Sequence, residues 1–466
     1  MSWSRESADE TQSPLTGGKG RTRDMSPMGA SFCRGTWPAD MNMIPPMINC
    51  LVFFKTPPDL ATIVSEFEKH LWPCHRFNSC MDDGKWTQRH DNLDRGYHFR
   101  EESLRSEDEI DPWVAKAMFE KLDPTYPPWR ATLLKTWSGR SAMWIMMHHC
   151  IGDGLGLLFA FSTMLQCSKG DPLNFVPLPN LLLPPSKRKP ETAQSRSSKS
   201  SCCSSCCSAT RGVLVAVLCQ ADTELSINAP LADRTPYVIF NNNRVYTRFP
   251  SVPMSKLKAT RERFSCTVND VMMAALVGAL RRYGAEEKND PKLKPGGDKV
   301  DFKVMMMVGL PREINDKDYH GSLCNNMLFT SCPLPIDQPT PETRMIGTIT
   351  SMNNLKDKPY MGGVIGFTKF ITGVAPVQTL RKAAAETFSK HSMLITNVPG
   401  FSTPVSVAGG EVDEVQMVFP NIILQFSIMT YNGSVNANLV ADPALYPRPE
   451  KLAQMWCEEF DLLAKA

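Results

Sequence analysis

His148-His149-Cys150-Ile151-Gly152-Asp153-Gly154 (HHCIGDG) stands between two apolar segments of the chain. Residues 144–147 before it (Trp-Ile-Met-Met) have the apolar character of a buried strand, and residues 155–168 after it that of a buried helix. Gly152 and Gly154 permit a tight backbone turn between them. A strand, a turn and a helix in succession are typical of α/β proteins, and loops held between rigid elements often carry catalytic side chains.

A histidine of this pair can act as a general base, because an imidazole exchanges protons near neutral pH. An alcohol is a poor nucleophile until a base accepts its proton, whereas a thioester such as acyl-CoA is already activated. One positioned histidine would therefore suffice for acyl transfer without a covalent enzyme intermediate. Asp153 could orient the loop through a salt bridge. On these residues alone, an ordinary hydrogen-bonded histidine beside a buried strand remains the alternative.

Other catalytic patterns find little support in the chain. The segment Gly-Asp-Gly-Leu-Gly at 152–156 is similar to a dinucleotide-binding turn but lacks the full G-x-G-x-x-G pattern. The chain also has no G-x-S-x-G, H-E-x-x-H or Walker A sequence. Nicotinamide or flavin binding, and hydrolase, metalloprotease and nucleotide-hydrolysing mechanisms, are therefore disfavoured.

Strand and helix patterns alternate on both sides of this motif, which predicts an α/β fold in two halves. Residues 1–40 are rich in Ser, Thr, Gly and charge, and we predict a disordered tail there. The first half is predicted over 41–185. A Ser- and Cys-rich flexible linker is predicted over 186–211, since it has few large apolar residues to bury. The second half is predicted over 212–466.

Composition narrows the class of protein. The 466 residues are 42% hydrophobic, enough for two cores, and the formal net charge is only +3, without the concentrated basic face of a nucleic-acid binder. The polar N-terminus lacks the apolar core of a secretory signal, so the 15 cysteines favour a reducing compartment over a disulfide framework. No apolar run reaches the roughly 18–20 residues of a membrane-spanning helix. A protein acting on lipids would then lie on the membrane.

Two further compositional features leave alternatives open. The cysteines in the linker could be S-acylated and anchor the chain to a lipid surface, could form half of a zinc site, or could be unmodified; they are Cys202, Cys203, Cys206 and Cys207. The 26 methionines cluster in apolar runs. Such runs suit ordinary core strands, and a flexible thioether lining would also suit an acyl chain.

The chain is similar to the wax ester synthase/diacylglycerol acyltransferase family. HHCIGDG matches its H-H-x-x-x-D-G signature and the looser H-x-x-x-D-G of the CoA-dependent acyltransferase superfamily. Six further segments resemble family elements in the right order, from about Met43 to the C-terminus: 127–130 (P-L-W), 267–272 (N-D-V), 308–312 (a strand ending in Arg), 321–335 (G-N then P-L-P), 396–400 (N-V-P-G) and 431–433 (Y-N-G). Pro128, residues 309–311 and the inserted Ser- and Cys-rich linker depart from the usual pattern, and none of them involves the proposed base.

This resemblance implies two chloramphenicol-acetyltransferase-like subdomains, each a mixed β-sheet with helices, and an active-site tunnel between them. By the same resemblance His149 is the base, His148 supports it, and Asp153 pairs with an arginine, for which Arg312 is the candidate. Five residues are expected to line the tunnel or support it: Gly154, Asn269, Asp270, Arg312 and Asn397. Asn269 or Asp270 could instead cap a helix, and the segment containing Asn397 could simply form a turn.

The function implied is an acyl-CoA-dependent O-acyltransferase that esterifies a long-chain fatty alcohol, diacylglycerol or both. Acyl-CoA would be a co-substrate, and no metal or tightly bound cofactor is expected. The expected location is peripheral, on the cytosolic face of the endoplasmic reticulum membrane or on a lipid droplet. Two alternatives remain: a soluble acyltransferase for small alcohols or amines, disfavoured because D-F-G-W-G is missing, and a non-catalytic protein that coats lipid surfaces.

Overall fold

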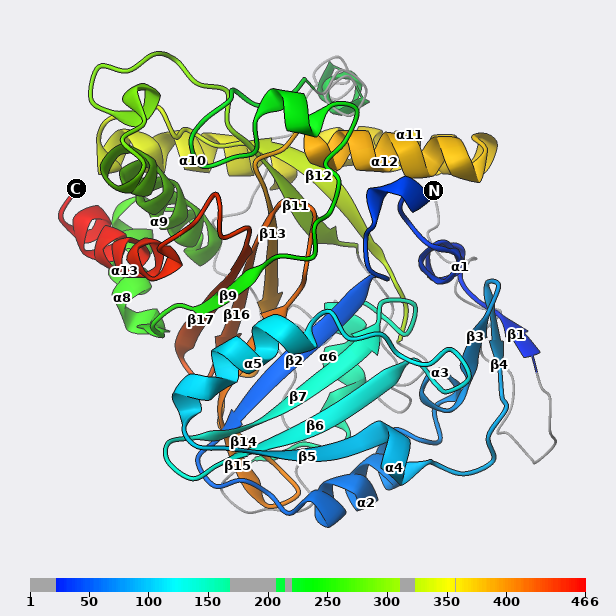
Figure 1. The fold of residues 1–466 in the computed structure, drawn as a ribbon. Helices are drawn as coiled ribbons and strands as arrows, with labels where there is room; N and C mark the ends of the chain where they lie inside the picture. Colours follow the sequence, from blue (N-terminus) through cyan, green and yellow to red (C-terminus); the bar gives the residue numbers. More distant parts are fainter. Residues whose placement is uncertain (1–21, 168–206, 214–219, 311–322, 357) are drawn as a thin grey trace.

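The computed structural model describes residues 22–167, 207–213, 220–310, 323–356 and 358–466. Each half contains a seven-stranded mixed sheet with helices packed on it (Figure 1). The predicted α/β fold in two halves is therefore confirmed. Arg312 lies outside the described residues, as do Cys202, Cys203 and Cys206.

The first sheet is built around β2 (Met47–Phe54), whose near-continuous apolar sequence is buried on both faces. Its neighbour β7 (Ser141–His148) runs antiparallel to it, with Met47 opposite His148. In spatial order the strands are β5 (Phe99–Leu104), β6 (Trp129–Thr136), β7, β2, β15 (Gly410–Val418), β14 (Val405–Val407) and β8 (Gln166–Cys167).

The second sheet packs on α9 (Val268–Arg282), a helix buried along nearly its whole length. In spatial order the strands are β10 (Val252–Pro253), β17 (Ser434–Ala441), β16 (Leu424–Tyr431), β13 (Met393–Pro399), β11 (Lys303–Gly309) and β12 (Met327–Pro333), with β9 (Val245–Arg248) also on β17. A small third sheet joins β1 (Thr22–Asp24), β4 (Lys85–Thr87) and β3 (Cys80–Asp82).

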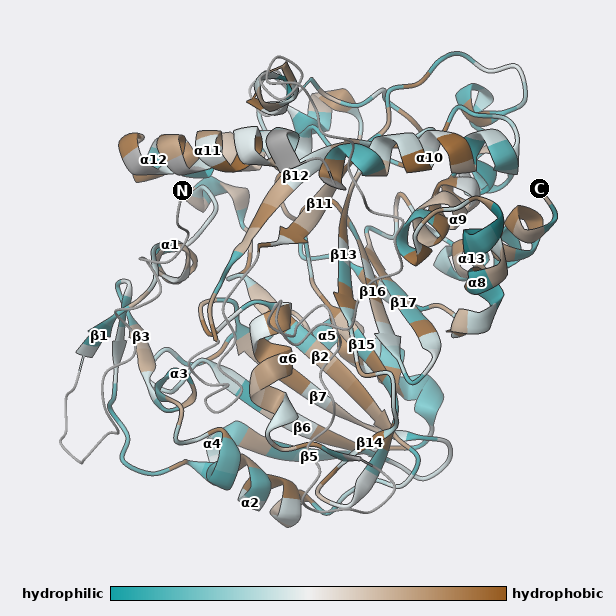
Figure 2. Cartoon of the chain, turned by 180° about the vertical axis from the view of Figure 1, so that it is seen from behind, coloured by the Kyte–Doolittle hydropathy of each residue, from teal (hydrophilic) through white to brown (hydrophobic). Residues whose placement is uncertain are grey.

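The remaining helices cover these sheets and the ends of the molecule. Those of the first half are α1 (Pro27–Arg34), α2 (Leu60–His70), α3 (His75–Asn78), α4 (Arg95–His98), α5 (Ile110–Ala117) and α6 (Gly154–Ser162). Those of the second half are α8 (Met254–Arg263), α10 (Pro341–Lys356), α11 (Lys358–Val374), α12 (Val377–Ser389) and α13 (Pro449–Lys465). Hydropathy colouring shows that α6 and the strands facing it are strongly apolar (Figure 2).

The two halves are interlocked, which corrects the predicted boundary. Strands β14 and β15 come from the range assigned to the second half, yet they belong to the first sheet. β15 pairs antiparallel with β2, with Gln416 opposite Leu51. The predicted boundary at residue 212 therefore does not separate the two sheets, because strand pairing across the molecule leaves no mark in local sequence.

The predicted disordered tail is also wrong for residues 22–40. β1 and α1 form there, and Ser26 caps α1 by accepting a hydrogen bond from the Gly29 amide. Few of these residues are large and apolar, which is why composition alone predicts disorder; their order comes from packing on the rest of the chain. Residues 1–21 lie outside the described part.

Of the predicted linker, 186–206 lies outside the described residues, and 207–211 belongs to a helix over 207–213. This helix touches α11 closely: a Cβ placed at Gly212 would come within 2.3 Å of the Tyr360 carbonyl oxygen, and one at Gly363 within 2.1 Å of the Ala209 carbonyl oxygen. Glycine is therefore needed at both positions. Flexibility is the wrong prediction for 207–211, and Cys207 there is exposed.

Candidate active site

The histidine motif occupies the turn between β7 and α6. β7 ends at His148, and α6 begins at Gly154 with Asp153 as its N-cap. One Asp153 carboxylate oxygen accepts the Gly156 amide at 2.9 Å, satisfying a donor in the first turn of the helix. The other oxygen accepts the Asn326 amide at 2.9 Å. Asp153 therefore links the motif to the segment that leads into β12 in the second half.

His149 is buried and is held by an amide from the second half. Its Nδ1 lies 3.0 Å from Oδ1 of Asn325. Asn325 Nδ2 donates to the His149 carbonyl at 2.8 Å and also faces the Cys150 carbonyl. Because the amide nitrogen is engaged by carbonyl groups, the amide oxygen must face the ring, so Nδ1 carries the proton. The lone pair of Nε2 is then available to accept a proton.

The surroundings keep His149 in its neutral form. Burial lowers the pKa of His149, against smaller opposing effects of a backbone hydrogen bond, Asp153 and Asn325. A lowered pKa means that the imidazole is unprotonated at neutral pH. Only the unprotonated ring can accept a proton, so this is the state that a general base requires.

His148 precedes His149 and has a structural environment. Its Nδ1 accepts the Cys150 amide at 3.2 Å, which closes the turn after β7. Burial lowers the pKa of His148 to about 3, with a further contribution from His149. These contacts fit the supporting role predicted for His148.

Asn269 and Asn397 meet at the junction of α9 and β13. Asn397 Nδ2 donates to Asn269 Oδ1 at 3.0 Å. The cap of α9 is Thr267, and Asp270 completes a capping box in which its carboxylate accepts the Thr267 amide at 2.8 Å. The predicted alternative, in which Asn269 or Asp270 caps a helix, is therefore corrected. Asp270 supports the cap through the capping box, and neither residue is the cap itself.

Gly154 allows α6 to approach the second half. A Cβ at this position would lie 3.1 Å from Cγ2 of Val398, tighter than most side-chain contacts. Val398 follows Asn397 directly on β13. Gly154 therefore contacts β13 at the residue next to Asn397, whose own side chain bonds to Asn269.

Two side chains in contact with His149 escape the sequence prediction. Asn325 lies within the G-N…P-L-P run, where a pair of asparagines before an apolar strand is the available signal. Phe32 packs its ring on the imidazole, with centroids 4.4 Å apart and planes at 31°. It lies in the range predicted to be disordered, and nothing in its neighbourhood along the chain points to the histidine.

An apolar cavity of about 140 Å³ adjoins the motif. It is enclosed mainly by the first sheet, α2 and α6, and it reaches the second half at Val398, Met429 and Tyr431. Gly154 and Met147 line it where it approaches the histidines. Five flexible methionines line the cavity: Met143, Met147, Met164, Met417 and Met429.

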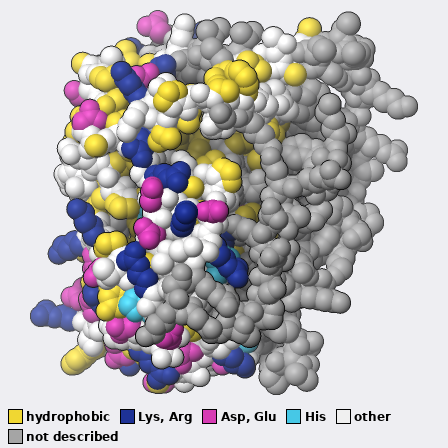
Figure 3. Space-filling view, turned by 90° about the vertical axis from the view of Figure 1, so that its right-hand side faces the viewer, with side chains coloured by type: hydrophobic (Ala, Val, Ile, Leu, Met, Phe, Trp, Pro, Cys, Tyr) yellow, Lys and Arg dark blue, Asp and Glu magenta, His cyan; other side chains and the backbone are white. Residues whose placement is uncertain are grey.

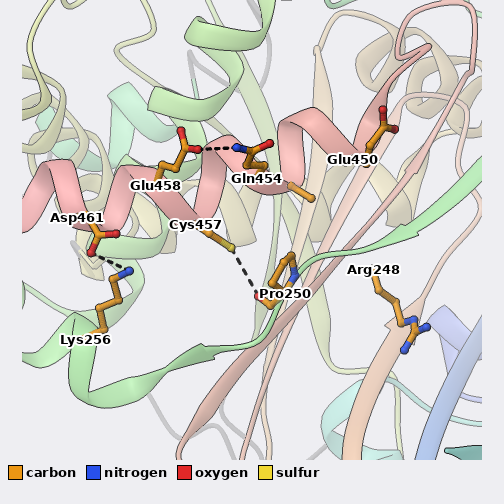
Figure 4. A pocket seen from close by; sticks show the side chains of 9 residues that line it. Arg248, Pro250, Lys256, Glu450, Gln454, Cys457, Glu458 and Asp461 are labelled. Carbon is orange, nitrogen blue, oxygen red and sulfur yellow. Dashed lines mark hydrogen bonds and ion pairs between the residues drawn. The ribbon is translucent and has the colours of Figure 1, made fainter. Parts of the chain in front are cut away.

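A second hollow, of about 380 Å³, lies between α13 and the β9–β10 segment (Figure 4). Lys256 pairs there with Asp461 at 2.8 Å, and Gln454 donates to Glu458 at 2.9 Å. It contains none of the predicted site residues. Among the residues that the structure describes, no cluster of three or more His, Cys, Asp or Glu is placed to hold a metal ion.

Comparison with known proteins places this chain in a family. The model of the wax ester synthase/diacylglycerol acyltransferase catalytic domain matches residues 65–272, and that of the WS/DGAT C-terminal domain matches residues 323–464. Wax ester synthase/diacylglycerol acyltransferase 7 of Arabidopsis thaliana is 24% identical over 89% of this chain and 92% of its own length. The probable diacylglycerol O-acyltransferase tgs1 of Mycobacterium tuberculosis is 22% identical over 85% and 86%.

Solved structures show the same fold. The wax ester synthase/diacylglycerol acyltransferase from Marinobacter aquaeolei VT8 aligns with a TM-score of 0.63 at 17% identity, over 95% of this chain and 100% of that one. The first condensation domain of the calcium-dependent antibiotic synthetase aligns at 0.57 and 11% identity, over 96% of each chain. Fold and family together define an acyltransferase. The chain belongs to the wax ester synthase/diacylglycerol acyltransferase family.

Proposed function

We propose that this enzyme transfers the acyl group of acyl-CoA to the hydroxyl of a long-chain fatty alcohol, of diacylglycerol or of both, with His149 as general base. The observation that carries the proposal is the contact of His149 Nδ1 with Asn325 Oδ1 at 3.0 Å. It fixes the tautomer in which Nε2 can accept a proton. The names of the relatives, which are diacylglycerol acyltransferases and wax ester synthases, support these acceptors.

The reaction follows from that tautomer. Nε2 of His149 accepts the hydroxyl proton while the alcohol oxygen bonds to the thioester carbonyl carbon. The tetrahedral oxyanion then collapses: the C–S bond breaks, the ester forms, and the CoA thiolate takes the proton back from Nε2. No covalent enzyme intermediate and no metal enter this scheme. Asp153 and Asn325 hold the loop and the ring in place, and His148 closes the turn.

The apolar cavity beside Gly154 is the proposed site of a fatty chain. A cavity of about 140 Å³ accommodates only a short hydrocarbon segment, comparable to the engineered cavities of about 150 Å³ that bind benzene. A longer chain requires the lining to move. The five methionines supply that freedom, because an unbranched thioether adapts its rotamers at little cost.

His149→Ala tests the base directly. We expect the variant to fold and to lose nearly all transfer, measured as CoA released and ester formed from acyl-CoA and a fatty alcohol. His90→Ala is a matched control, because His90 contacts Tyr126 and the Thr125 carbonyl away from the motif. Turnover close to wild type in folded His149→Ala would refute the assignment. Loss of activity in both variants would do the same.

The acceptor is tested by lipid analysis in a host that makes no neutral lipid. Wax ester that appears only when fatty alcohol is supplied identifies the alcohol as acceptor, and triacylglycerol without added alcohol identifies diacylglycerol. Esters or amides of small alcohols or amines alone would favour the small-substrate alternative. A protein that yields none of these products would be a non-catalytic lipid-surface protein.

We further propose that the enzyme works at a lipid surface, on the cytosolic face of the endoplasmic reticulum or on lipid droplets. No helix in the described residues is long and apolar enough to cross a membrane. Apolar side chains nevertheless gather on the face shown in Figure 3, over the ends of α11 and α12. Phe370, Val374 and Val377 are 63%, 64% and 52% exposed at that corner.

Vesicle flotation tests this surface. We expect the enzyme to float with vesicles of neutral and anionic phospholipid, and Phe370→Asp with Val374→Asp to abolish flotation while transfer to a dispersed short-chain alcohol continues. Trp137→Asp is the control, because Trp137 is an exposed aromatic residue on the β6–β7 hairpin. Flotation unaffected by the α11 changes would refute the proposed corner.

A further inference from the structure

Helix α1 lies directly on the histidine motif. Its Phe32 is buried, and its ring packs against the imidazole of His149 with centroids 4.4 Å apart. Gly29, one turn earlier, also faces the motif: a Cβ placed there would lie 3.6 Å from the Cys150 carbonyl oxygen. One face of α1 therefore covers one face of the imidazole.

The segment that carries Phe32 is fastened to the first half at the β3–β4 hairpin. The Met25 amide donates to the Gly84 carbonyl at 2.9 Å, and the Gly84 amide donates to Cys33 Sγ at 3.3 Å. Arg34 Nε pairs with Asp83 Oδ1 at 2.9 Å. β1 extends the attachment by pairing with β4. The residues that make these bonds lie on both sides of Phe32 in the sequence: Met25 before it, and Cys33 and Arg34 after it.

The same segment is fastened to the second half a few residues later. Arg381 Nε on α12 donates to the Gly35 carbonyl at 2.7 Å. Trp37 packs edge-on against Phe388 of α12 with ring centroids 5.0 Å apart, and Tyr237 donates to the Asp40 carboxylate. Residues 22–41, which we call the strap, thus run from the β3–β4 hairpin to α12 past His149. Figure 1 shows α1 between these two attachments.

The base needs a contact of this kind. The bond from Nδ1 to Asn325 fixes one atom of the ring, but the imidazole can still tilt about that bond. A ring packed against its face removes the tilt, because the imidazole cannot turn without separating the two surfaces. The direction of the Nε2 lone pair is then set by two contacts, one from Asn325 and one from the strap.

We propose that Phe32 is a positioning residue that fixes the plane of the His149 imidazole, held in place by the strap between the two halves. The proposal rests on the proposed role of His149 as base. The strap precedes residues 65–272 and so lies outside both ranges matched by the family models. Phe32 acts through His149, so it affects turnover more than substrate binding.

Phe32→Leu tests the proposal by separating kcat from KM. We expect kcat to fall roughly 10-fold while KM for acyl-CoA and for the alcohol changes less than about twofold, because a transition-state alignment is lost and binding is not. Phe32→Tyr keeps the aromatic face and should retain most of kcat. Phe249→Leu is the matched control, because Phe249 is equally buried in the core of the second half. It should lower Tm without lowering kcat.

Three results would overturn the proposal: wild-type kcat in folded Phe32→Leu, equal loss of kcat in Phe249→Leu, or a rise in KM that accounts for the whole effect. If Phe32→Leu does not fold, Arg381→Gln replaces it, since this change releases the strap from α12; an unchanged kcat there refutes the proposal. Activity in His149→Ala would refute the base itself. If His149→Ala is inactive and Phe32→Leu has the wild-type kcat, only the role of Phe32 is refuted.

Discussion

Asp153 caps α6 and Asp270 lies in the first turn of α9, and each carboxylate accepts a backbone amide. The amides that bond to these two carboxylates lie at very different separations along the chain. Asp270 of α9 bonds back to Thr267, three residues earlier, and closes a capping box within the helix start. One carboxylate oxygen of Asp153 accepts an amide of its own helix, and the other accepts the Asn326 amide, 173 residues further along the chain.

The site is assembled by a cap that also reaches the other half. A local cap stabilises one helix, whereas a cap with a second, distant partner also fixes where that helix stands relative to the other half. The neighbour of Asn326, Asn325, holds the His149 ring. Asp153 thus brings to the histidine the segment that orients it, whereas the bonds between Asp270 and Thr267 lie within the start of α9.

The largest effect is expected from Asp153→Ala. It removes both the cap and the link to Asn326, and a displacement of about 1 Å in the base can cost roughly 100-fold in rate. We expect kcat to fall by about that factor and the free energy of unfolding by about 1–2 kcal/mol. Steady-state CoA release and thermal melting measure the two. Asp153→Asn sharpens the result, since one amide oxygen must serve two donors; a kcat within about twofold of wild type in Asp153→Ala would contradict the link.

A smaller effect, on pH dependence, is expected from Asn325→Asp. Burial lowers the pKa of His149 in the wild type, so kcat/KM should hold through neutral pH and fall only below the ordinary histidine value of about 6.5. A carboxylate beside Nδ1 favours the protonated ring and raises that pKa. The acid limb of the kcat/KM profile should therefore move to higher pH. Coincident acid limbs in the two proteins would show that position 325 does not act on the ring.

The smallest effect on catalysis is expected from Asp270→Ala. The loss of one half of the capping box should reduce the free energy of unfolding by about 1 kcal/mol, visible as a Tm lower by a few degrees. We expect kcat to stay within about twofold of wild type. A fall as large as that of Asp153→Ala would instead support the alternative that Asp270 lines or supports the substrate tunnel.

The sequence predicts the part of the fold that local patterns determine. The apolar run before His148 and the apolar segment after Gly154 correspond to β7 and α6, and the family resemblance is confirmed by both matching family models. The catalytic role of His149 stays a prediction, as does the pairing of Asp153 with Arg312. The structure adds contacts that agree with the first, and the second lies outside the described residues.

The contacts that complete the site depend on residues far apart in the chain, which is why the sequence does not predict them. Phe32 and His149 are brought together by a strap whose composition indicates disorder. Asn325 bonds to a ring 176 positions away. Neither pairing follows from hydrophobic periodicity, which determines the face of an element but not its partner. The placement of β15 beside β2 is missed for the same reason.

The exchange of β14 and β15 has a consequence for dissecting the protein. A fragment that stops before residue 405 would leave one edge of β2 without its neighbour, exposing a row of unsatisfied amides and carbonyls flanked by apolar side chains. Such a fragment should aggregate instead of remaining in solution. The halves therefore cannot be produced as separate working pieces, and heat should melt them in one cooperative step.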